Sequence, residues 1–322
     1  MTEIEHTSDL APTSFGRGYA IALLSSIILS TTAIFIRYLT QTYQMPALIL
    51  AFWRDILVTV TLLSVLGLFK PVLLKIERRQ IWFYIAYGIV LAIFNSVWTL
   101  SVALNGASIA TVLAYSSAAF TVLFGWLLLK ENVGWVKIVV VFLSLMGCVL
   151  VADALNVGVW HANPMGILAG LVSGLAYAGY SLMGRSAAQK GLNTWTTILF
   201  IFAFASIILL VINLLPGEFI PGTANHSSDM FWLQDAWDGW IILILLAVGP
   251  TLIGYGIYNL SLVYLPASVT NLVLTTEPAF TALIAYFTLG ERLTIDQILG
   301  SLLILAGVIL LRLYEGRKIV VK

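Results

Sequence analysis

Three ionisable side chains lie inside long apolar stretches of this chain. Arg54 and Asp55 belong to the stretch from 46 to 69, and Glu277 belongs to the stretch from 267 to 289. Stretches of about 20 apolar residues can cross a lipid bilayer, where a charge at mid-helix costs about 2.5–3.5 kcal/mol. Charged residues at that depth are rare and mark solute pathways, proton relays or buried ion pairs.

Arg54 could bind an anionic group of a solute, such as a carboxylate, because a guanidinium presents a planar fork of donors. Two alternatives stay open: Arg54 pairs with Glu277, or Arg54 and Asp55 form a structural network near the outer end of their helix. Adjacent residues point about 100° apart on a helix, so Arg54 and Asp55 cannot both face one cavity squarely.

Glu277 lies about ten residues into its stretch and precedes Pro278. A proline at that position frees a backbone carbonyl and allows a kink. A carboxylate at a kink in mid-membrane could carry a proton. The alternative is a packing carboxylate that bonds the backbone of neighbouring helices.

Polar and aromatic residues form a second set of candidates, because many of them recur three or four positions apart and therefore share a helix face. Thr111 and Tyr115 form one such pair. A cavity with these side chains would suit a solute that has both apolar and hydrogen-bonding parts. The alternative is that they join helices or form interfacial aromatic belts. The candidate substrate-binding and translocation residues are Arg54, Asn95, Trp98, Tyr115, Tyr177, Tyr180, Ser181, Tyr255, Tyr258, Asn259, Asn271 and Thr275.

The composition is that of a membrane protein. Of 322 residues, 60% are hydrophobic and 10% are charged, whereas soluble domains carry about 25% charged residues. The formal net charge of +1 does not favour a nucleic-acid partner. The single cysteine, Cys148, excludes an internal disulfide or a cysteine metal site, and the three histidines lie outside the apolar stretches. We expect no metal and no cofactor.

Ten stretches are long and apolar enough to span a bilayer, and lipid requires that they be helical because no backbone group can stay unpaired there. Asn105-Gly106, Leu265-Pro266 and Gly290-Glu291 mark tight breaks between antiparallel neighbours. The predicted fold is all-α with ten transmembrane helices. Their ranges are 17–37, 46–69, 81–103, 107–129, 134–153, 164–186, 195–214, 239–263, 267–289 and 293–313.

The basic residues predict the orientation. With the amino terminus in the cytoplasm, 13 of the 16 Lys and Arg residues fall on the cytoplasmic side, as the positive-inside rule requires. The tails at 1–16 and 314–322 are then cytoplasmic. The loop at about 215–238 lies outside, and its cluster of aromatic residues favours a segment in the outer interface, with a functional lid as the alternative.

The fourth and fifth stretches repeat as the ninth and tenth at an offset of 160 residues. Between 107–150 and 267–310, 13 of 44 positions are identical without a gap, including Glu131 with Glu291 and Gly147 with Gly307. We therefore predict two five-helix repeats, at 17–153 and 164–313. Because five is odd, the second repeat enters the membrane in the opposite direction, which is typical of secondary transporters with a midplane site.

Glycines predict where helices approach or bend. Gly166, Gly170 and Gly174 form a ridge on the sixth stretch that allows another helix to pack closely. Gly249-Pro250 interrupts the eighth stretch, which indicates either a break at a binding site or a tolerated kink.

The segment from Glu277 to Thr294, EPAFTALIAYFTLGERLT, resembles the EP…L-G-E-x-L-T stretch of EamA-type carriers in the drug/metabolite transporter (DMT) superfamily. The first repeat has a weaker version from Ser117 to Val133, in which Ser117-Ala118 replaces Glu-Pro. Arg54 also resembles a family feature, whereas Asp55 is less usual. The resemblance covers residues 18–313 and implies a carrier for amino acids, related metabolites or drugs, often exported.

No Walker, HExxH, GxSxG or EF-hand motif is present, so we expect neither ATP-driven pumping by this chain nor an enzyme. The predicted function is a secondary transporter in the plasma (bacterial inner) membrane that works by alternating access. The expected partners are lipid, a small solute and, as a candidate coupling ion, the proton at Glu277. A passive channel and a non-transporting membrane enzyme or scaffold are the alternatives, and a monomer and a homodimer both stay open.

Overall fold

The computed structural model describes residues 12–155, 163–215, 220–224, 226–289 and 294–320, and all regular secondary structure in these ranges is helical. This confirms the predicted fold class. The helices of the first repeat are α1 (Pro12–Leu29), α2 (Thr32–Thr42), α3 (Ala47–Phe69), α4 (Ile81–Tyr115), α5 (Ser117–Leu129) and α6 (Trp135–Val151). Those of the second are α7 (Pro164–Gln189), α8 (Thr194–Leu214), α9 (Trp237–Leu246), the π-helix η5 (Ala247–Gly254), α10 (Tyr255–Tyr264), α11 (Ala267–Leu274), α12 (Glu277–Leu289) and α13 (Ile295–Val320). Short 3₁₀ turns occupy Pro71–Leu74, Arg78–Gln80 and Ser227–Phe231.

The helices correspond to the ten predicted spans, although several spans are divided. Within the described residues, eight stretches are long and apolar enough to cross a membrane, and α6 is a shorter apolar helix. The remaining span consists of α11 and α12, each too short to cross alone. Gly106, with φ of +79°, separates the third span from the fourth inside α4, because glycine adopts positive φ without steric penalty.

Three spans are broken at serine or threonine residues, a feature that the sequence analysis did not predict. The breaks lie at Ser30-Thr31 between α1 and α2, at Ser116 between α4 and α5, and at Thr275-Thr276 between α11 and α12. At each break the hydroxyl groups donate to the carbonyl three residues earlier, at 2.6–2.8 Å. Such bonds satisfy acceptors that a continuous helix would use, so the chain can turn without leaving them unpaired.

The second and third of these breaks are equivalent in the two repeats, since Ser116 plus 160 is Thr276. The helix after each break begins at an equivalent residue, Ser117 for α5 and Glu277 for α12. Pro278 is the second residue of α12. The N–H groups of the first turn of a helix have no acceptor within that helix, so a proline is tolerated there. The predicted kink is therefore a full interruption of the helix.

Equivalent helices of the two repeats pack against each other in antiparallel pairs. A Cβ atom on Gly147 of α6 would lie 2.5 Å from Ile304 Cγ1 of α13, and a Cβ atom on Gly307 would lie 3.8 Å from Ser144 Oγ. Because 144 and 304 are themselves 160 residues apart, this contact has two-fold symmetry. The earlier residue of one helix meets the later residue of the other, so the helices run in opposite directions.

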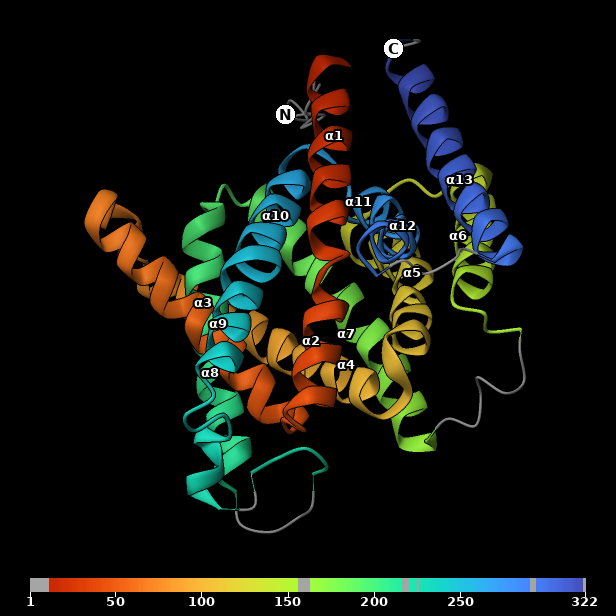
Figure 1. The fold of residues 1–322 in the computed structure, drawn as a ribbon. Helices are drawn as coiled ribbons and strands as arrows, with labels where there is room; N and C mark the ends of the chain where they lie inside the picture. The colour runs from red at the N-terminus through yellow and green to blue at the C-terminus, as the bar shows by residue number, and fades with distance from the viewer. Residues whose placement is uncertain (1–11, 156–162, 216–219, 225, 290–293, 321–322) are drawn as a thin grey trace.

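The second span of each repeat forms a similar pair. Asn213 Nδ2 near the end of α8 donates to Leu48 O near the start of α3 at 3.1 Å. Thr196 Oγ1 near the start of α8 donates to Leu73 O just after α3 at 2.9 Å. The inverted repeat is thus a property of the fold, with α3 and α8 on one side of the molecule and α6 and α13 on the other (Figure 1). The start of α1 and the end of α13 lie on the same side (Figure 1).

The glycine ridge on α7 receives α4 and its continuation. Cβ atoms on Gly166, Gly170 and Gly174 would lie 2.2–2.6 Å from side-chain atoms of Asn105, Leu113 and Ser116, respectively. Any larger residue would push these helices apart. The prediction of close packing on this ridge is confirmed.

Phe231 of the 215–238 loop and Trp240 of α9 pack against Trp53. The ring centroid of Trp53 lies 5.4 Å from that of Phe231 and 4.8 Å from that of Trp240, and Trp53 Nε1 donates to Met230 O.

Nearby, the Tyr43 hydroxyl donates to Asp238 Oδ2 at 2.5 Å, and this bond raises the pKa of Tyr43 to about 12.

Candidate functional site

A narrow cavity of about 30 Å³ lies where the divided helices of the two repeats meet. That volume holds about one water-sized molecule. Of the predicted site residues, five line it: Trp98, Tyr115, Tyr177, Tyr255 and Glu277. The other lining residues are Leu29, Thr32, Phe94, Thr111 and Ala114.

Both repeats contribute the same spans to this cavity. The first repeat supplies its first, third and fourth spans through α1, α2 and α4, and the second supplies its first, third and fourth spans through α7, α10 and α12. The second and fifth spans of each repeat form the outer pairs. A cavity built from equivalent helices lies on the axis that relates the two repeats, which is the position expected of a transport site.

Two hydrogen bonds join the divided spans across this axis. Tyr115 OH, before the break in the first repeat, donates to Glu277 Oε2 at 2.5 Å. Ser117 Oγ, after that break, donates to Asn271 Oδ1 at 3.1 Å. Ser117 is the counterpart of Glu277, so each repeat uses the residue that opens its second half-helix to contact the other repeat. The chemistry differs, because the second repeat places a carboxylate where the first has a hydroxyl.

Ser181, Tyr258 and Asn271 are buried behind the cavity and bond one another. Tyr258 OH donates to Ser181 Oγ at 2.6 Å, and Asn271 Nδ2 donates to the same oxygen at 3.1 Å. Thr275 Oγ1 lies 3.1 Å from Ser144 Oγ. These side chains join α7, α10, α11 and α6, so in this conformation their polar groups hold helices together.

A second buried network contains Asn259 and Tyr180. Asn259 Nδ2 donates to Tyr180 OH at 2.5 Å and to Tyr255 O at 2.9 Å. Tyr87 OH donates to Asn259 Oδ1 at 3.3 Å. Tyr87 was not singled out from the sequence, where nothing distinguishes it from other aromatic residues of its span.

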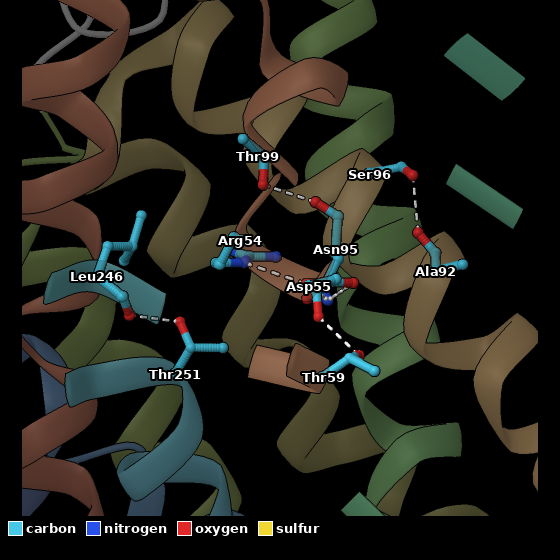
Figure 2. Close-up of polar contacts among 9 residues, drawn as sticks. All are labelled: Arg54, Asp55, Thr59, Ala92, Asn95, Ser96, Thr99, Leu246 and Thr251. Atoms are coloured by element: carbon cyan, nitrogen blue, oxygen red, sulfur yellow. Dashed lines mark hydrogen bonds and ion pairs between the residues drawn. The ribbon is translucent and has the colours of Figure 1, made fainter. Parts of the chain in front are cut away.

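Arg54 and Asp55 form a buried cluster with Asn95, outside the residues that line the cavity (Figure 2). Arg54 is 2% exposed and its Nε lies 3.4 Å from Asp55 Oδ1. Asn95 Nδ2 donates to both carboxylate oxygens of Asp55, at 2.8 and 2.9 Å. In this structure the charged partner of Arg54 is Asp55 on the same helix, and Arg54 forms no ion pair with Glu277.

Two atoms of this cluster are buried without a hydrogen-bond partner: Arg54 Nη2 and Asn95 Oδ1. Buried polar groups are nearly always paired, so each of these two atoms marks a place where a polar ligand or a water would be stabilised. Asn95 lies between Phe94 and Trp98 on α4, and both of those line the cavity. One helix wall thus separates the cluster from the cavity.

The π-helix η5 packs against α3 beside this cluster. Pro250 has no N–H to offer to Leu246 O, and Thr251 Oγ1 donates to that carbonyl instead, at 2.8 Å (Figure 2). π-Helical turns are rare and concentrate at functional sites. Gly249-Pro250 therefore widens the eighth span without ending it, directly before the cavity residue Tyr255.

At one end of the molecule, the first repeat caps a helix of the second. Glu131 Oε1 accepts the backbone N–H of Ala267 at 2.8 Å, and Glu131 Oε2 accepts that of Ser268 at 3.2 Å. The Ser268 hydroxyl also contacts Glu131 Oε2, and buried Lys137 donates to that hydroxyl from 3.0 Å. A carboxylate at a helix start satisfies unpaired N–H groups and complements the helix dipole. Glu291, the counterpart of Glu131, lies outside the described residues.

Comparison with known proteins gives the family. The model of the EamA-like transporter family matches this chain twice, over residues 16–152 and 164–313. The chain belongs to the EamA-like transporter family. It is therefore a membrane transporter of the DMT superfamily, as the resemblance of its Glu277 segment indicated.

The chain is also similar to proteins named as transporters. The chain is 24% identical over 306 residues to an uncharacterized transporter of Clostridium kluyveri, covering 91% of this chain and 92% of the relative. It is 27% identical over 249 residues to the threonine/homoserine exporter RhtA of Salmonella typhimurium, covering 76% of each. A crystal structure with 17% identity superposes with a TM-score of 0.73, over 94% of this chain and 98% of that chain, and shows that the fold is shared.

Within the described residues, no group of three or more His, Cys, Asp or Glu side chains is placed to hold a metal ion.

The residues that the sequence analysis missed are Leu29, Thr32, Phe94 and Ala114 of the cavity wall. Thr32 follows Ser30-Thr31, so the cluster of hydroxyl residues was an available signal. Leu29, Phe94 and Ala114 resemble any lipid-facing residue in sequence and carry no such signal.

Proposed function

We propose that this EamA-like transporter is a secondary carrier that exports a small amino acid or a related metabolite by alternating access. The observation that carries the proposal is the cavity formed by equivalent spans of two inverted repeats. Two such halves can exchange conformations, and the exchange opens the site first to one side of the membrane and then to the other. The relatives named threonine/homoserine exporters support amino acids as the cargo and export as the direction.

The proposed location is the bacterial plasma membrane with both termini in the cytoplasm, on the basis of the positive-inside distribution. Cysteines introduced into the 215–238 loop should react with an impermeant maleimide added to intact cells. Reaction only after the cells are opened would reverse the orientation.

Glu277 is the proposed proton-coupling group, because it is a carboxylate in the cavity at a break between half-helices. An imposed pH gradient should drive cargo uptake into proteoliposomes of the wild-type chain and not of Glu277→Gln. Proton-driven uptake that survives this substitution would reject the role.

Solute counterflow tests the carrier itself. Purified protein would be reconstituted with unlabelled L-threonine or L-homoserine inside the vesicles and the labelled solute outside. A carrier accumulates label transiently because internal solute returns the site to the outside. A passive channel shows no such stimulation, so uptake independent of internal solute would favour that alternative.

A further inference from the structure

The cavity contains a carboxyl group that has no oppositely charged partner in the described structure. Among the residues that the structure describes, Glu277 is the one charged side chain in the cavity lining. Within the described ranges no lysine or arginine forms an ion pair with it, and its side-chain hydrogen bond comes from the neutral Tyr115 hydroxyl. Ionisable groups within a membrane protein normally pair with a group of opposite charge, or they face a cavity through which a solute or ion passes.

Four aromatic side chains line the same cavity as Glu277. Phe94, Trp98, Tyr177 and Tyr255 line the same cavity. Phe94 and Tyr177 stack with centroids 4.9 Å apart and 13° between planes, and Phe94 and Trp98 stack at 6.3 Å. The faces that these stacked rings turn toward one another are covered, whereas any ring face open to the cavity is electronegative and attracts a cation that has left water behind.

We propose that this cavity binds its cargo through a positively charged ammonium group, held by the Glu277 carboxylate and surrounded by the rings of Phe94, Trp98, Tyr177 and Tyr255. The inference rests on the proposed carrier function and names the chemical group that the same site recognises. A carboxylate and a set of aromatic faces both stabilise a cation and both disfavour an anion. A cargo that also carries a carboxylate must therefore hold it away from Glu277.

The Tyr115 hydroxyl sets the geometry of this recognition. It donates to Glu277 Oε2, and no side chain in the described part of the chain donates to Oε1. An ammonium group can bond Oε1 directly and can replace the tyrosine at Oε2. Because Tyr115 and Glu277 belong to different repeats, cargo bound here contacts both moving halves.

Thermal unfolding of the purified full-length protein in detergent tests the proposal, since a ligand that binds the native state raises the midpoint. The probes are n-propylammonium, propionate and n-propanol, which share one carbon skeleton. We expect n-propylammonium to raise the midpoint in a dose-dependent manner and the other two to raise it far less. The Glu277→Gln variant should bind n-propylammonium about tenfold more weakly or worse, because it keeps an acceptor for Tyr115 but loses the charge. Glu131→Gln, a carboxylate outside the cavity, should leave the affinity unchanged.

Tyr115→Phe keeps the ring and removes the competing donor, so it should bind n-propylammonium as tightly as the wild type or more tightly. If Glu277→Gln does not fold, the affinity of Tyr115→Phe for n-propylammonium tests the ammonium site instead. Equal shifts with propionate, wild-type affinity in Glu277→Gln, or severalfold weaker binding in Tyr115→Phe would overturn the ammonium site. Solute counterflow distinguishes failure of the ammonium site from failure of the carrier function. Transport with no preference for amines would refute the ammonium site alone. Ammonium binding without counterflow would refute the carrier function alone.

Discussion

Replacing Asp55 with leucine should destabilise the protein strongly, because it strands a buried charge. The Asp55 carboxylate is fully buried and accepts three contacts: one from Arg54 Nε at 3.4 Å and two from Asn95 Nδ2 at 2.8 and 2.9 Å. Without it, the guanidinium of Arg54, which already has an unpaired Nη2, retains no counter-charge in the described structure. Breaking a buried ion pair in this way costs about 3–5 kcal/mol of unfolding free energy.

Removing both charges should be far less harmful than removing one. The Arg54→Leu, Asp55→Leu double variant leaves Asn95 as the one member of the cluster with unmet hydrogen bonds, an expected loss of about 1–3 kcal/mol. The two substitutions should therefore be non-additive by about 2 kcal/mol or more, with the double variant more stable than Asp55→Leu.

The assay is equilibrium unfolding of the purified protein in mixed micelles with increasing sodium dodecyl sulfate, followed by helical circular dichroism. The wild type, both single variants and the double variant complete the cycle. A double variant that is as unstable as the sum of the singles would refute the reasoning about charge compensation.

The same double variant distinguishes the two roles left open for Arg54. If it folds and retains counterflow, Arg54 and Asp55 act as a structural network. If it folds and loses counterflow, Arg54 binds an anionic part of the cargo. Arg54→Lys and Arg54→Gln refine the second outcome, because lysine keeps the charge without the planar fork.

Three further predictions follow from the packing and the caps. Glu131→Ala should lower the unfolding free energy, measured by unfolding in sodium dodecyl sulfate, by about 1–3 kcal/mol because the N–H groups at the start of α11 lose their acceptor. An unchanged unfolding midpoint would contradict the cap. Gly147→Leu should destabilise by about 1–3 kcal/mol, since its Cβ would lie 2.5 Å from Ile304 Cγ1, whereas Gly307→Ala, with its closest contact at 3.5 Å, should be tolerated. Tyr43, titrated as the ultraviolet difference between wild type and Tyr43→Phe, should ionise near pH 12, and Asp238→Asn should return it toward 10. The neutral hydroxyl donates to the ionised carboxylate of Asp238, whose pKa this bond lowers. The bond therefore stabilises the fold fully between the ordinary pKa of an aspartate and about pH 10, and it is lost as the pH rises through about 12 or falls far enough to protonate Asp238; an unshifted titration would refute it.

The spans and the inverted repeat were predictable because each depends on a signal that is averaged over many residues. Bilayer thickness sets the span length, and the 160-residue offset relates two whole segments. The helix breaks were not predicted, because each depends on one or two hydroxyl groups that bond the backbone. Ser30-Thr31, Ser116-Ser117 and Thr275-Thr276 are pairs of adjacent hydroxyl residues within their spans. The equivalence of Ser116 and Thr276 in the two repeats could have indicated two of the breaks.

The site residues show what spacing can and cannot determine. Helical spacing placed Asn95 and Trp98 on one face, yet Trp98 lines the cavity while Asn95 bonds Asp55. Tyr177 lines the cavity, whereas Ser181, one turn later, accepts bonds from α10 and α11. A helix face is a property of one segment, but its neighbour at each depth is a property of the packed fold.

Solute counterflow in proteoliposomes tests the central claim most directly. The first cargoes are those that stabilise the purified protein in a thermal screen, beginning with L-threonine and L-homoserine. The account predicts that unlabelled solute inside the vesicles drives a transient accumulation of label above the external concentration, with the overshoot diminished in Glu277→Gln. Label that equilibrates at the same rate with and without internal solute would contradict alternating access through this cavity.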